Sequence, residues 1–331
     1  MGMLIDGVWC ADTDRFMQDG AFIREASTLP ANSAQKLAAR LRDTGRVVLV
    51  ASWSCPWSHR TTLVRVLKRL EGIPVALAGG PRVEGYAVTG LGAEWPSDIR
   101  PVHALYTATY PTHTGRATVP VLWDKDAGKI LSNSSAHIAR ALDRVGASWR
   151  LAPDAQDREI DALNARITQG LANAVYRAGF ATAQAAYDAA IGDVFATLDW
   201  LEAHLADHRC LLGQQITEAD LFLFATLVRF DAVYVPLFRC TRRRLVSYPA
   251  VWAYARDIYS WPGIADTCDF EANLRGYFLN DTENNPHGIV PEVPEDDWAA
   301  PHDRDRLGPL TVWRDGGIVP FDDRMESACD D

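Results

Sequence analysis

The segment from Arg46 to Leu70 constrains the fold of this chain more than any other stretch. It begins with a β-branched run, Arg46–Ala51, which is typical of a buried strand. Cys55 and Pro56 follow after a short gap, and Pro56 suits the first turn of a helix, where its missing N–H costs nothing. Apolar residues then recur at helical spacing, at Leu63, Val66, Leu67 and Leu70. The segment therefore predicts a strand that leads into a helix, with Cys55 as the N-cap residue or next to it.

This position gives Cys55 a chemical role. Unpaired N–H groups and the helix dipole at a helix N-terminus favour a thiolate, which is a usable nucleophile. The alternative is that Cys55 is a small buried residue without a reaction to perform. Ser58 stands where a dithiol redox protein would carry its second cysteine. Internal disulfide chemistry is therefore not expected, and one-thiol chemistry with an external thiol is favoured.

Composition and charge exclude several classes of protein. A chain of 331 residues with 48% hydrophobic residues predicts a globular protein of two domains. The net charge of −10 argues against nucleic acid as the main partner. No apolar run approaches membrane-spanning length, and the N-terminus lacks the regions of a signal peptide. The six cysteines show no paired framework and no zinc-like spacing, so we expect reduced thiols, no metal and a cytoplasmic protein.

The first part of the chain predicts an α/β domain. Residues 1–40 show little periodicity and are expected to form an N-terminal extension. Residues 41–146 form the domain itself, in which Pro74–Ala78 predicts a second strand, parallel to the first through a right-handed crossover. Residues 79–115 are an insertion rich in Gly, Pro and aromatic residues. An insertion of this length is usually functional or partly ordered by its own contacts.

A strand with an internal proline follows the insertion. In the run Thr118–Asp124, Pro120 requires an edge, a bulge or a turn. A cis bond between Val119 and Pro120 would leave the Val119 backbone free to bond a ligand peptide, and the alternative is a trans proline on an edge strand. A hairpin turn at residues 126–128 then leads to another strand, after which Asn133 or Ser134 caps a helix. The order is β-α-β, then a β-hairpin, then a helix.

Only helical patterns appear in the second part of the chain, residues 155–280. The sequence Thr217 to Asp220 is typical of a capping box at a helix N-terminus, and we interpret it as structural. Residues 281–331 form an acidic, Pro-rich tail that is expected to lie on the surface. Further helices are predicted at Ala183–Leu205, Pro249–Tyr259 and Ala272–Phe278.

The α/β part resembles the thioredoxin-like half of a glutathione transferase. In that family the backbone of the Val-Pro pair, here Val119 and Pro120, hydrogen-bonds glutathione. A serine at the N-terminus of the last helix, here Ser134, takes the γ-glutamyl carboxylate. An anion suits a helix N-terminus, so the resemblance agrees with the physical chemistry. The fold class implied is an α/β thioredoxin-like domain followed by an all-α glutathione-transferase domain.

Six motifs occur together and in order, which makes a closer resemblance. They are CPWSHR at 55–60, TGRATVPVLWD at 114–124, VYRAGFATAQAAY at 175–187, LVRFDAVYV at 227–235, RGYF at 275–278 and NPHGIVP at 285–291. Together they are similar to those of the glutathionyl-hydroquinone reductases, the Xi class of glutathione transferases. This resemblance implies a homodimer, glutathione as cosubstrate, and removal of glutathione from glutathionyl-hydroquinones.

The resemblance also implies roles for individual residues. Cys55 attacks the sulfur of the glutathionyl group, and a second glutathione then releases oxidised glutathione. Tyr176 and Tyr277 match the two substrate-site tyrosines of the family. A phenol there can stabilise charge on a ring oxygen or protonate the ring of the leaving hydroquinone. The alternative for either tyrosine alone is packing in the core.

The glutathione site departs from the family pattern in two places. The family usually has Glu where this chain has Asn133, so a charged bond to the γ-glutamyl ammonium becomes a neutral one. Tyr86 aligns by position with a glutathione-site tryptophan of the family. Trp57 is also assigned to the glutathione site, and Arg116 either binds a glutathione carboxylate or forms a structural ion pair.

Three hypotheses about function remain open at this point. The first is the reductase with Cys55 as nucleophile. The second is another glutathione enzyme on the same scaffold, such as a thioether-cleaving lyase or a dehalogenase-type transferase. The third is a non-catalytic interaction module, against which the presence of Cys55 and both tyrosines argues.

Overall fold

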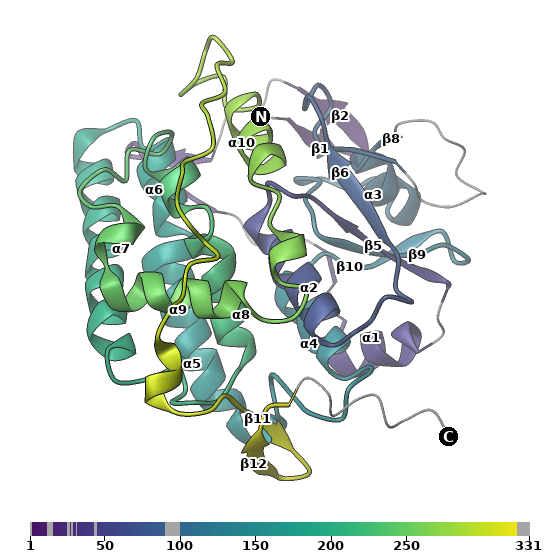
Figure 1. Cartoon of the computed structure of the whole chain (residues 1–331). Coiled ribbons are helices and arrows are strands. Elements are labelled where there is room, and N and C mark those ends of the chain that lie inside the picture. Colours follow the sequence, from purple (N-terminus) through teal and green to yellow (C-terminus); the bar gives the residue numbers. More distant parts are fainter. Residues whose placement is uncertain are drawn as a thin grey trace.

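The computed structural model describes residues 2–11, 16–24, 27, 29–30, 32–42, 45–89 and 100–322. Residues 90–99 of the predicted insertion and the last residues of the predicted tail lie outside this part. Figure 1 shows an α/β domain beside a helical domain, with the chain passing from the first to the second. The order of these two parts agrees with the sequence prediction.

A six-stranded sheet forms the centre of the α/β domain. Its strand order is β10-β9-β5-β6-β7-β8, with β5 and β6 parallel and β9 antiparallel to β5. The predicted parallel pair is therefore confirmed. The predicted insertion supplies β7 and β8, which extend one edge of the sheet. The strands are β5 (Val47–Ala51), β6 (Val75–Gly79), β7 (Ala87–Val88), β8 (Arg100–Pro101), β9 (Val121–Asp124) and β10 (Lys129–Ser132).

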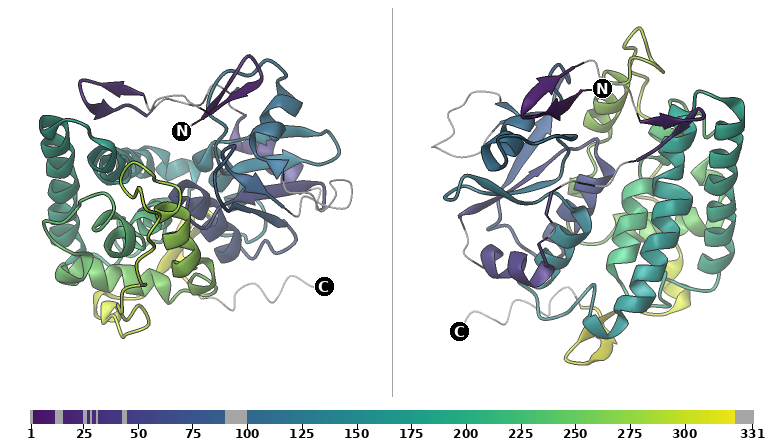
Figure 2. Two further views of the ribbon diagram at one scale, coloured as in Figure 1. Left: turned by 90° about the horizontal axis from the view of Figure 1, so that it is seen from above. Right: turned by 180° about the vertical axis from the view of Figure 1, so that it is seen from behind.

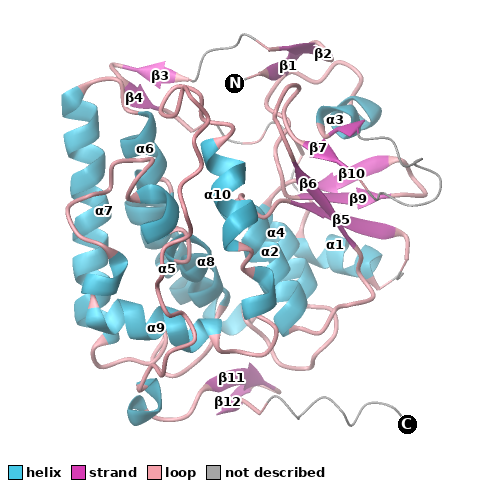
Figure 3. Ribbon diagram, turned by 45° about the horizontal axis from the view of Figure 1, so that its top comes forward, coloured by secondary structure: helices cyan, strands magenta, loops and turns pink. Residues whose placement is uncertain are grey.

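Helices cover both faces of this sheet (Figure 3). Leu49 of β5 packs in the core that includes α1, α2 and α4, whereas Val48 and Val50 face the core that includes α3. Every residue of β5 is buried, as expected for a strand covered on both sides. The helices are α1 (Ala34–Leu41), α2 (Pro56–Leu67), α3 (His103–Thr109) and α4 (Ser135–Asp143).

The second domain is all helical. Its central helix, α8 (Glu218–Leu227), is buried along its whole length. Two π-helical segments, Thr168–Ala172 and Phe230–Tyr234, follow α5 and α8. The other helices are α5 (Asp157–Ile167), α6 (Ala174–Phe180), α7 (Gln184–Leu205), α9 (Pro249–Tyr259) and α10 (Phe270–Phe278). Short 3-10 helices occur at Asp154–Gln156, Leu245–Ser247, Ala265–Thr267 and Arg304–Leu307.

The predicted capping box begins α8. The Thr217 N–H donates to Asp220 Oδ2 at 2.9 Å, and the Thr217 side chain also bonds Asp220. Asp220 further accepts bonds from the Leu211 N–H and the Tyr254 hydroxyl. Burial raises the pKa of Asp220, and these hydrogen bonds lower it in part. The box thus ties the start of α8 to the preceding loop and to α9, and the structural interpretation of this motif is confirmed.

An N-terminal strap, the described residues between Gly2 and Asn32, joins the two domains. It contains two hairpins, β1 (Met3–Ile5) with β2 (Val8–Cys10), and β3 (Met17–Gln18) with β4 (Ala21–Phe22). Figure 2 shows the first hairpin over the α/β domain and the second over the helical domain. The sequence analysis expected an extension here but did not predict these hairpins.

Hydrogen bonds attach the strap to both domains. The Leu4 N–H donates to the Gly115 carbonyl at 2.9 Å, in the α/β domain. The Thr182 N–H donates to the Gly20 carbonyl at 3.0 Å, in the helical domain. Gly20 has a φ of +76°, and a Cβ there would lie 2.4 Å from the Ala183 Cβ, so only glycine fits. The chain then returns to the α/β domain, where Asn32 Nδ2 donates to the Leu131 carbonyl at 2.6 Å.

The C-terminal tail is more firmly attached than the sequence suggested. Arg304 is fully buried, and its guanidinium donates to the carbonyl of Leu205 at 2.6 Å. A hairpin of β11 (Thr311–Arg314) and β12 (Gly317–Pro320) follows, and the Ile216 N–H donates to the Thr311 carbonyl at 2.9 Å. No helix in the described part of the chain is long and apolar enough to cross a membrane.

Candidate active site

Cys55 lies where β5 leads into α2, and the structure confirms it as the N-cap residue with Pro56 in the first turn. The Ser58 N–H donates to Cys55 Sγ at 3.4 Å, and the thiol donates to the Val119 carbonyl at 3.4 Å. The Val119–Pro120 peptide bond is cis. The half-buried sulfur therefore lies between the start of α2 and the cis-proline loop.

Three tyrosines from three elements of the helical domain meet beside this junction. The hydroxyls of Tyr176 (α6) and Tyr277 (α10) are 2.6 Å apart. Tyr234, in the π-helical segment after α8, places its hydroxyl 3.3 Å from that of Tyr277. Trp57, two residues after Cys55, packs edge-on against Tyr176 at 5.7 Å between ring centroids. The hydroxyls thus form a chain whose Tyr176 end lies toward the first turn of α2.

All three phenols hold their protons at neutral pH. Burial raises the pKa of Tyr176, Tyr234 and Tyr277 well above 10, and their mutual repulsion raises each further. The charge of Cys55 is among the causes that raise the pKa of Tyr176, so this phenol lies near enough to the sulfur to interact with it. If Tyr234 donates to Tyr277 and Tyr277 to Tyr176, the Tyr176 proton is left for a ligand.

Helix α10 approaches Cys55 closely because Gly276 has no side chain. A Cβ at Gly276 would lie 2.4 Å from the Ser54 Cβ and 2.6 Å from its hydroxyl oxygen. Ser54 immediately precedes Cys55, and Gly276 immediately precedes Tyr277. The glycine therefore lets α10 bring Tyr277 up to the loop that holds Cys55.

Four arginines surround the site, and in the described part of the chain none of them forms an ion pair. Arg24 lies over the Trp57 ring at 4.2 Å, and Arg60 lies 5.0 Å from the same ring centroid. Arg82 lies 4.1 Å from the Tyr86 ring centroid and donates to Ser54 Oγ at 3.3 Å. The fourth is Arg229. In a chain of net charge −10, such a cluster of unpaired cations favours anionic ligands.

Arg229 clamps the loop before Cys55 from the helical domain. It is fully buried and donates to the carbonyls of Trp53 and Ala225, each at 2.6 Å, and to His59 Nδ1 at 2.9 Å. His59 Nε2 is 2.8 Å from Thr267 Oγ1. Burial, together with the Arg229 charge, lowers the pKa of His59 well below 6.5, so His59 is neutral and serves as a structural link.

We expect Arg229→Met to destabilise the protein strongly. The apolar side chain would leave the carbonyls of Trp53 and Ala225 and the His59 Nδ1 without a donor, at a cost of about 1–3 kcal/mol for each buried group. The free energy of unfolding in urea should fall by about 3–5 kcal/mol. Arg243→Met is the control, because Arg243 is exposed and its ion pair with Asp199 spans 3.7 Å. If both variants lose the same free energy of unfolding, the hydrogen bonds of Arg229 do not stabilise the protein more than an exposed ion pair does.

The residues expected to bind glutathione all come from the α/β domain. Ser134 is the N-cap of α4, and its Oγ accepts from the His137 N–H at 3.3 Å. Asn133 donates to the Tyr106 hydroxyl at 3.1 Å and accepts from Ser27 of the strap at 2.8 Å. The strap thus reaches the residue that stands in place of the family's Glu.

Two further candidates differ in how close they lie to Cys55. Tyr86 packs in the core cluster that includes Cys55, and a hydrogen bond with Ser54 lowers the pKa of Tyr86, which burial raises. Arg116 has its guanidinium 5.1 Å from the ring centroid of Phe16 in the strap. The structure therefore places Tyr86 at the site, whereas the described ring contact of Arg116 is with the strap.

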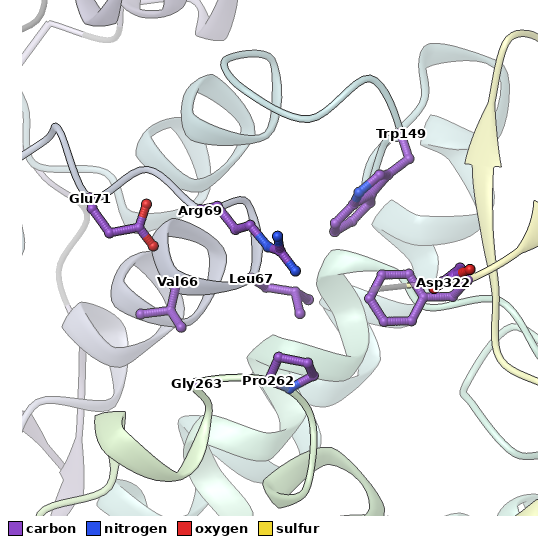
Figure 4. Close-up of a pocket in the computed structure, with 9 residues that line it drawn as sticks. Val66, Leu67, Arg69, Glu71, Trp149, Pro262, Gly263 and Asp322 are labelled. Carbon is purple, nitrogen blue, oxygen red and sulfur yellow. The ribbon is translucent and has the colours of Figure 1, made fainter. Parts of the chain in front are cut away.

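A cavity of about 200 Å³ lies elsewhere, between the two domains (Figure 4). Val66 and Leu67 of its lining are at the C-terminal end of α2, so it is on the order of 15 Å from Cys55. It is not part of the active site. The described residues contain no group of three or more His, Cys, Asp or Glu that could hold a metal ion.

The sequence analysis singled out neither the four arginines of the site nor Tyr234. Arg24, Arg60, Arg82, Arg229 and Tyr234 all contact the site, and none belongs to a spacing pattern that carries chemistry. Arg60, Arg229 and Tyr234 lie inside the quoted motifs CPWSHR and LVRFDAVYV, which was the available signal. Arg24 is in a segment without periodicity, and no signal in the sequence indicated it.

Comparison with known proteins gives concordant matches for both domains. Residues 54–145 match the family profile "Glutathione S-transferase, N-terminal domain", and residues 184–257 match "Glutathione S-transferase, C-terminal domain". The predicted order, a thioredoxin-like domain followed by an all-α transferase domain, is thereby confirmed.

Individual relatives cover almost the whole chain. Glutathionyl-hydroquinone reductase YqjG of Escherichia coli K12 is 40% identical over 326 residues, which is 92% of this chain and 99% of the relative. Glutathionyl-hydroquinone reductase PcpF of Sphingobium chlorophenolicum is 41% identical over 306 residues, or 89% and 96% of the two chains. The glutathione-bound structure of YqjG has a TM-score of 0.77 at 38% identity, covering 91% of this chain and 99% of that one. The Xi-class transferase of Natrialba magadii has a TM-score of 0.79 at 34% identity, covering 92% and 98%.

Proposed function

The chain belongs to the glutathione S-transferase family, and we propose that it acts there as a glutathionyl-hydroquinone reductase with Cys55 as its nucleophile. It is an enzyme with glutathione as cosubstrate. One observation supports these roles most strongly. Cys55, at the N-terminus of α2, lies beside Tyr176 and Tyr277, whose hydroxyls are 2.6 Å apart.

The reaction proceeds in two halves. The Cys55 thiolate attacks the glutathionyl sulfur, an S–S bond forms, and the C–S bond breaks with its electron pair passing to the ring of the hydroquinone. A proton then completes the hydroquinone. In the second half, a glutathione thiolate attacks the mixed disulfide, releases oxidised glutathione and restores the Cys55 thiolate. One glutathione thiol is consumed and the conjugate supplies the other glutathionyl sulfur, so two glutathione sulfurs are oxidised for each ring carbon reduced.

Tyr176 is the proposed proton donor. Its hydroxyl ends the tyrosine chain, its pKa is raised by burial, and the charge of Cys55 acts on it. Tyr277 positions it, because the 2.6 Å hydrogen bond between them orients the Tyr176 hydroxyl. A protonated phenol can hydrogen-bond the ring oxygen of the leaving group or protonate its carbon.

Glutathione is proposed to bind between the cis-proline loop and the N-terminus of α4. The Val119 and Pro120 backbone would pair with its peptide, and Ser134 at the α4 N-terminus would take the γ-glutamyl carboxylate. Asn133 would face the γ-glutamyl ammonium. The other proposed contacts, from the residues singled out in the sequence, are Trp57, Tyr86 and Arg116.

One incubation separates the candidate functions. Purified protein is mixed with a glutathionyl-hydroquinone and glutathione, and the products are separated by chromatography. The reductase yields free hydroquinone and oxidised glutathione in equal amounts. A transferase or lyase of another type leaves oxidised glutathione unformed, and a non-catalytic module leaves the conjugate unchanged.

Asn133→Glu is expected to tighten glutathione binding about fivefold, because a charge-assisted bond replaces a neutral one. Calorimetry at low and high salt checks this, and the gain should be smaller at high salt since a partly exposed pair is screened. Asn133→Ala is the control, and it also removes the bonds to Tyr106 and Ser27. Unchanged affinity in both variants would place the γ-glutamyl group elsewhere.

We also propose that the protein is a homodimer in the cytoplasm. Support for the dimer comes from the Xi-class resemblance, and sedimentation of the purified protein tests it. Support for the compartment comes from the cysteines, because all five in the described part are free thiols.

A further inference from the structure

The strap carries a cation to the active site. After the β3–β4 hairpin, Phe22 packs edge-on against Phe180 of α6 at 5.2 Å. Arg24 follows two residues later, and Ser27 then bonds Asn133 in the α/β domain. The short piece of chain that holds Arg24 is thus tied to one domain before it and to the other domain after it. Arg24 itself contacts Trp57 and Tyr176, at the junction where Cys55 and the tyrosines meet.

Arg24 lies against the two aromatic rings that border this junction. Its guanidinium carbon is 4.2 Å from the Trp57 ring centroid and 5.6 Å from that of Tyr176. Within the described part of the chain no carboxylate pairs with it, and the side chain is exposed. A guanidinium stacked on aromatic rings keeps its N–H groups free at its edge to bind an anion.

A second arginine, Arg60, also lies against the Trp57 ring. Arg60 is 5% exposed, lies against Trp57 and Phe222, and its Nε and Nη2 have no hydrogen-bond partner in the described part of the chain. Burial, the repulsion of Arg24 and other charges together bring the pKa of Arg60 to about 10. Two guanidiniums lie against one indole, and neither forms an ion pair with a described carboxylate, so together they favour a negatively charged ligand.

We propose that Arg24 binds the ring oxygen of the departing hydroquinone, and that it makes the enzyme tolerant of hydroquinones that are weak acids. The proposal rests on the reductase function above. The step begins from the keto form of the conjugate, in which Tyr176 has given its proton to the ring carbon that bears sulfur and a ring hydroxyl has lost its proton to solvent. When Cys55 takes the sulfur, the electron pair of the C–S bond enters the ring and the carbonyl oxygen becomes an oxyanion. Arg24 stabilises this oxyanion until solvent protonates it, and solvent also restores the proton of Tyr176.

The position over Tyr176 distinguishes this role from glutathione binding. The residues proposed for the peptide and the γ-glutamyl group of glutathione lie at the cis-proline loop and the α4 N-terminus, whereas Tyr176 is on α6. Trp57, which is also proposed for glutathione, contacts both Arg24 and Tyr176. A cation beside the proton donor lies where charge develops on the leaving group. If Arg24 merely holds the strap in place, its removal would affect every reaction of Cys55 alike.

The test compares two reactions of the same thiol. The first is hydroquinone release from glutathionyl-hydroquinones whose phenols differ in acidity. The second is reduction of a mixed disulfide of glutathione and 2-mercaptoethanol, in which the leaving group is a thiolate and no ring oxyanion forms. Both are measured for wild type, Arg24→Gln and Arg24→Lys. The matched control is Arg166→Gln, because Arg166 is also an exposed arginine, 3.6 Å from the Trp200 ring centroid, outside the site.

We expect Arg24→Gln to lower kcat/KM for hydroquinone release by on the order of 10- to 100-fold, the loss of a hydrogen bond to a charged group. Disulfide reduction should change less than about twofold, and Arg166→Gln should behave as wild type in both reactions. The loss should grow as the hydroquinone becomes less acidic, and Arg24→Lys should recover part of the rate because it keeps the charge.

Two results would overturn the proposal. Equal losses in both reactions would assign Arg24 to holding the strap, and a raised KM for glutathione alone would assign it to the cosubstrate. Wild-type protein that reduces the disulfide but releases no hydroquinone would instead overturn the proposed function, and this proposal with it.

Discussion

Replacing Cys55 with serine is expected to reduce hydroquinone release by on the order of 10⁴-fold or more. A serine hydroxyl cannot form the mixed disulfide with glutathione, so the route through that intermediate is closed. The fold should persist, because serine is also a favourable N-cap residue for α2. Circular dichroism of the variant should therefore match that of wild type.

Mass spectrometry can detect the mixed disulfide between Cys55 and glutathione directly. Wild type treated with oxidised glutathione should carry one glutathione, on Cys55. Cys268→Ser is the control, because Cys268 is also half-buried but burial raises the pKa of its thiol to about 11. That variant should retain activity and the adduct. A glutathione found on another cysteine, with Cys55 unmodified, would refute the mechanism.

The second large effect concerns the tyrosines. Tyr176→Phe should slow hydroquinone release by on the order of 100-fold or more, because the proton donor is removed. Tyr277→Phe should have a smaller effect, about 10-fold, because it removes only the hydrogen bond that orients Tyr176. In both variants, formation of the Cys55 adduct from oxidised glutathione should be nearly unaffected, since that step needs no proton on a ring.

Stopped-flow measurement of the first half-reaction checks the order of these effects. Tyr234→Phe is the matched control. It removes the hydroxyl that lies 3.3 Å from that of Tyr277, at the end of the row of tyrosine hydroxyls opposite to Tyr176. It should affect the rate least of the three. If Tyr277→Phe is the slowest variant, the donor is Tyr277, and the direction of the hydrogen-bond chain is reversed.

Local signals allowed much of the fold to be predicted. The Cys55–Pro56 junction, the capping box at Thr217 and the helix Pro249–Tyr259 each rest on neighbouring residues, and the structure confirms them. α10 begins at Phe270, earlier than predicted, because Asp269 caps it by accepting from the Ala272 N–H at 2.8 Å. An Asp before a helical pattern is itself a start signal, and it was overlooked.

The missed hairpins also had a signal. Each turns at an Asp-Gly pair in which both residues have positive φ: Asp6–Gly7, Asp19–Gly20 and Asp315–Gly316. Such pairs are among the strongest short-range hairpin signals. The strands beside them are only two to four residues long, too short to show an alternating pattern. Periodicity therefore does not predict these hairpins, whereas the Asp-Gly pairs at their turns do.

The electrostatics of the site could not be predicted from spacing. Arg24, Arg82 and Arg229 come from the strap, the insertion and the end of α8, and only the folded chain brings them to one sulfur. Nothing in a linear sequence shows that a buried arginine pairs with carbonyls instead of with a carboxylate. The resemblance indicated Cys55 and two phenols as the residues proposed for catalysis, and the structure added the positive charges around them.

The meeting of distant segments at Cys55 has a consequence for protein synthesis. The ribosome makes the strap before the two domains that it joins, yet Gly20 and Phe22 contact Thr182 and Phe180, which emerge much later. Tyr277 is made later still. Since domains fold from the N-terminus as they emerge, the α/β domain can form with its thiol before the proton donors exist. A nascent chain therefore carries the proposed nucleophile before the rest of the proposed site exists, and we expect catalysis to begin only when α10 has docked and the strap has bound the helical domain.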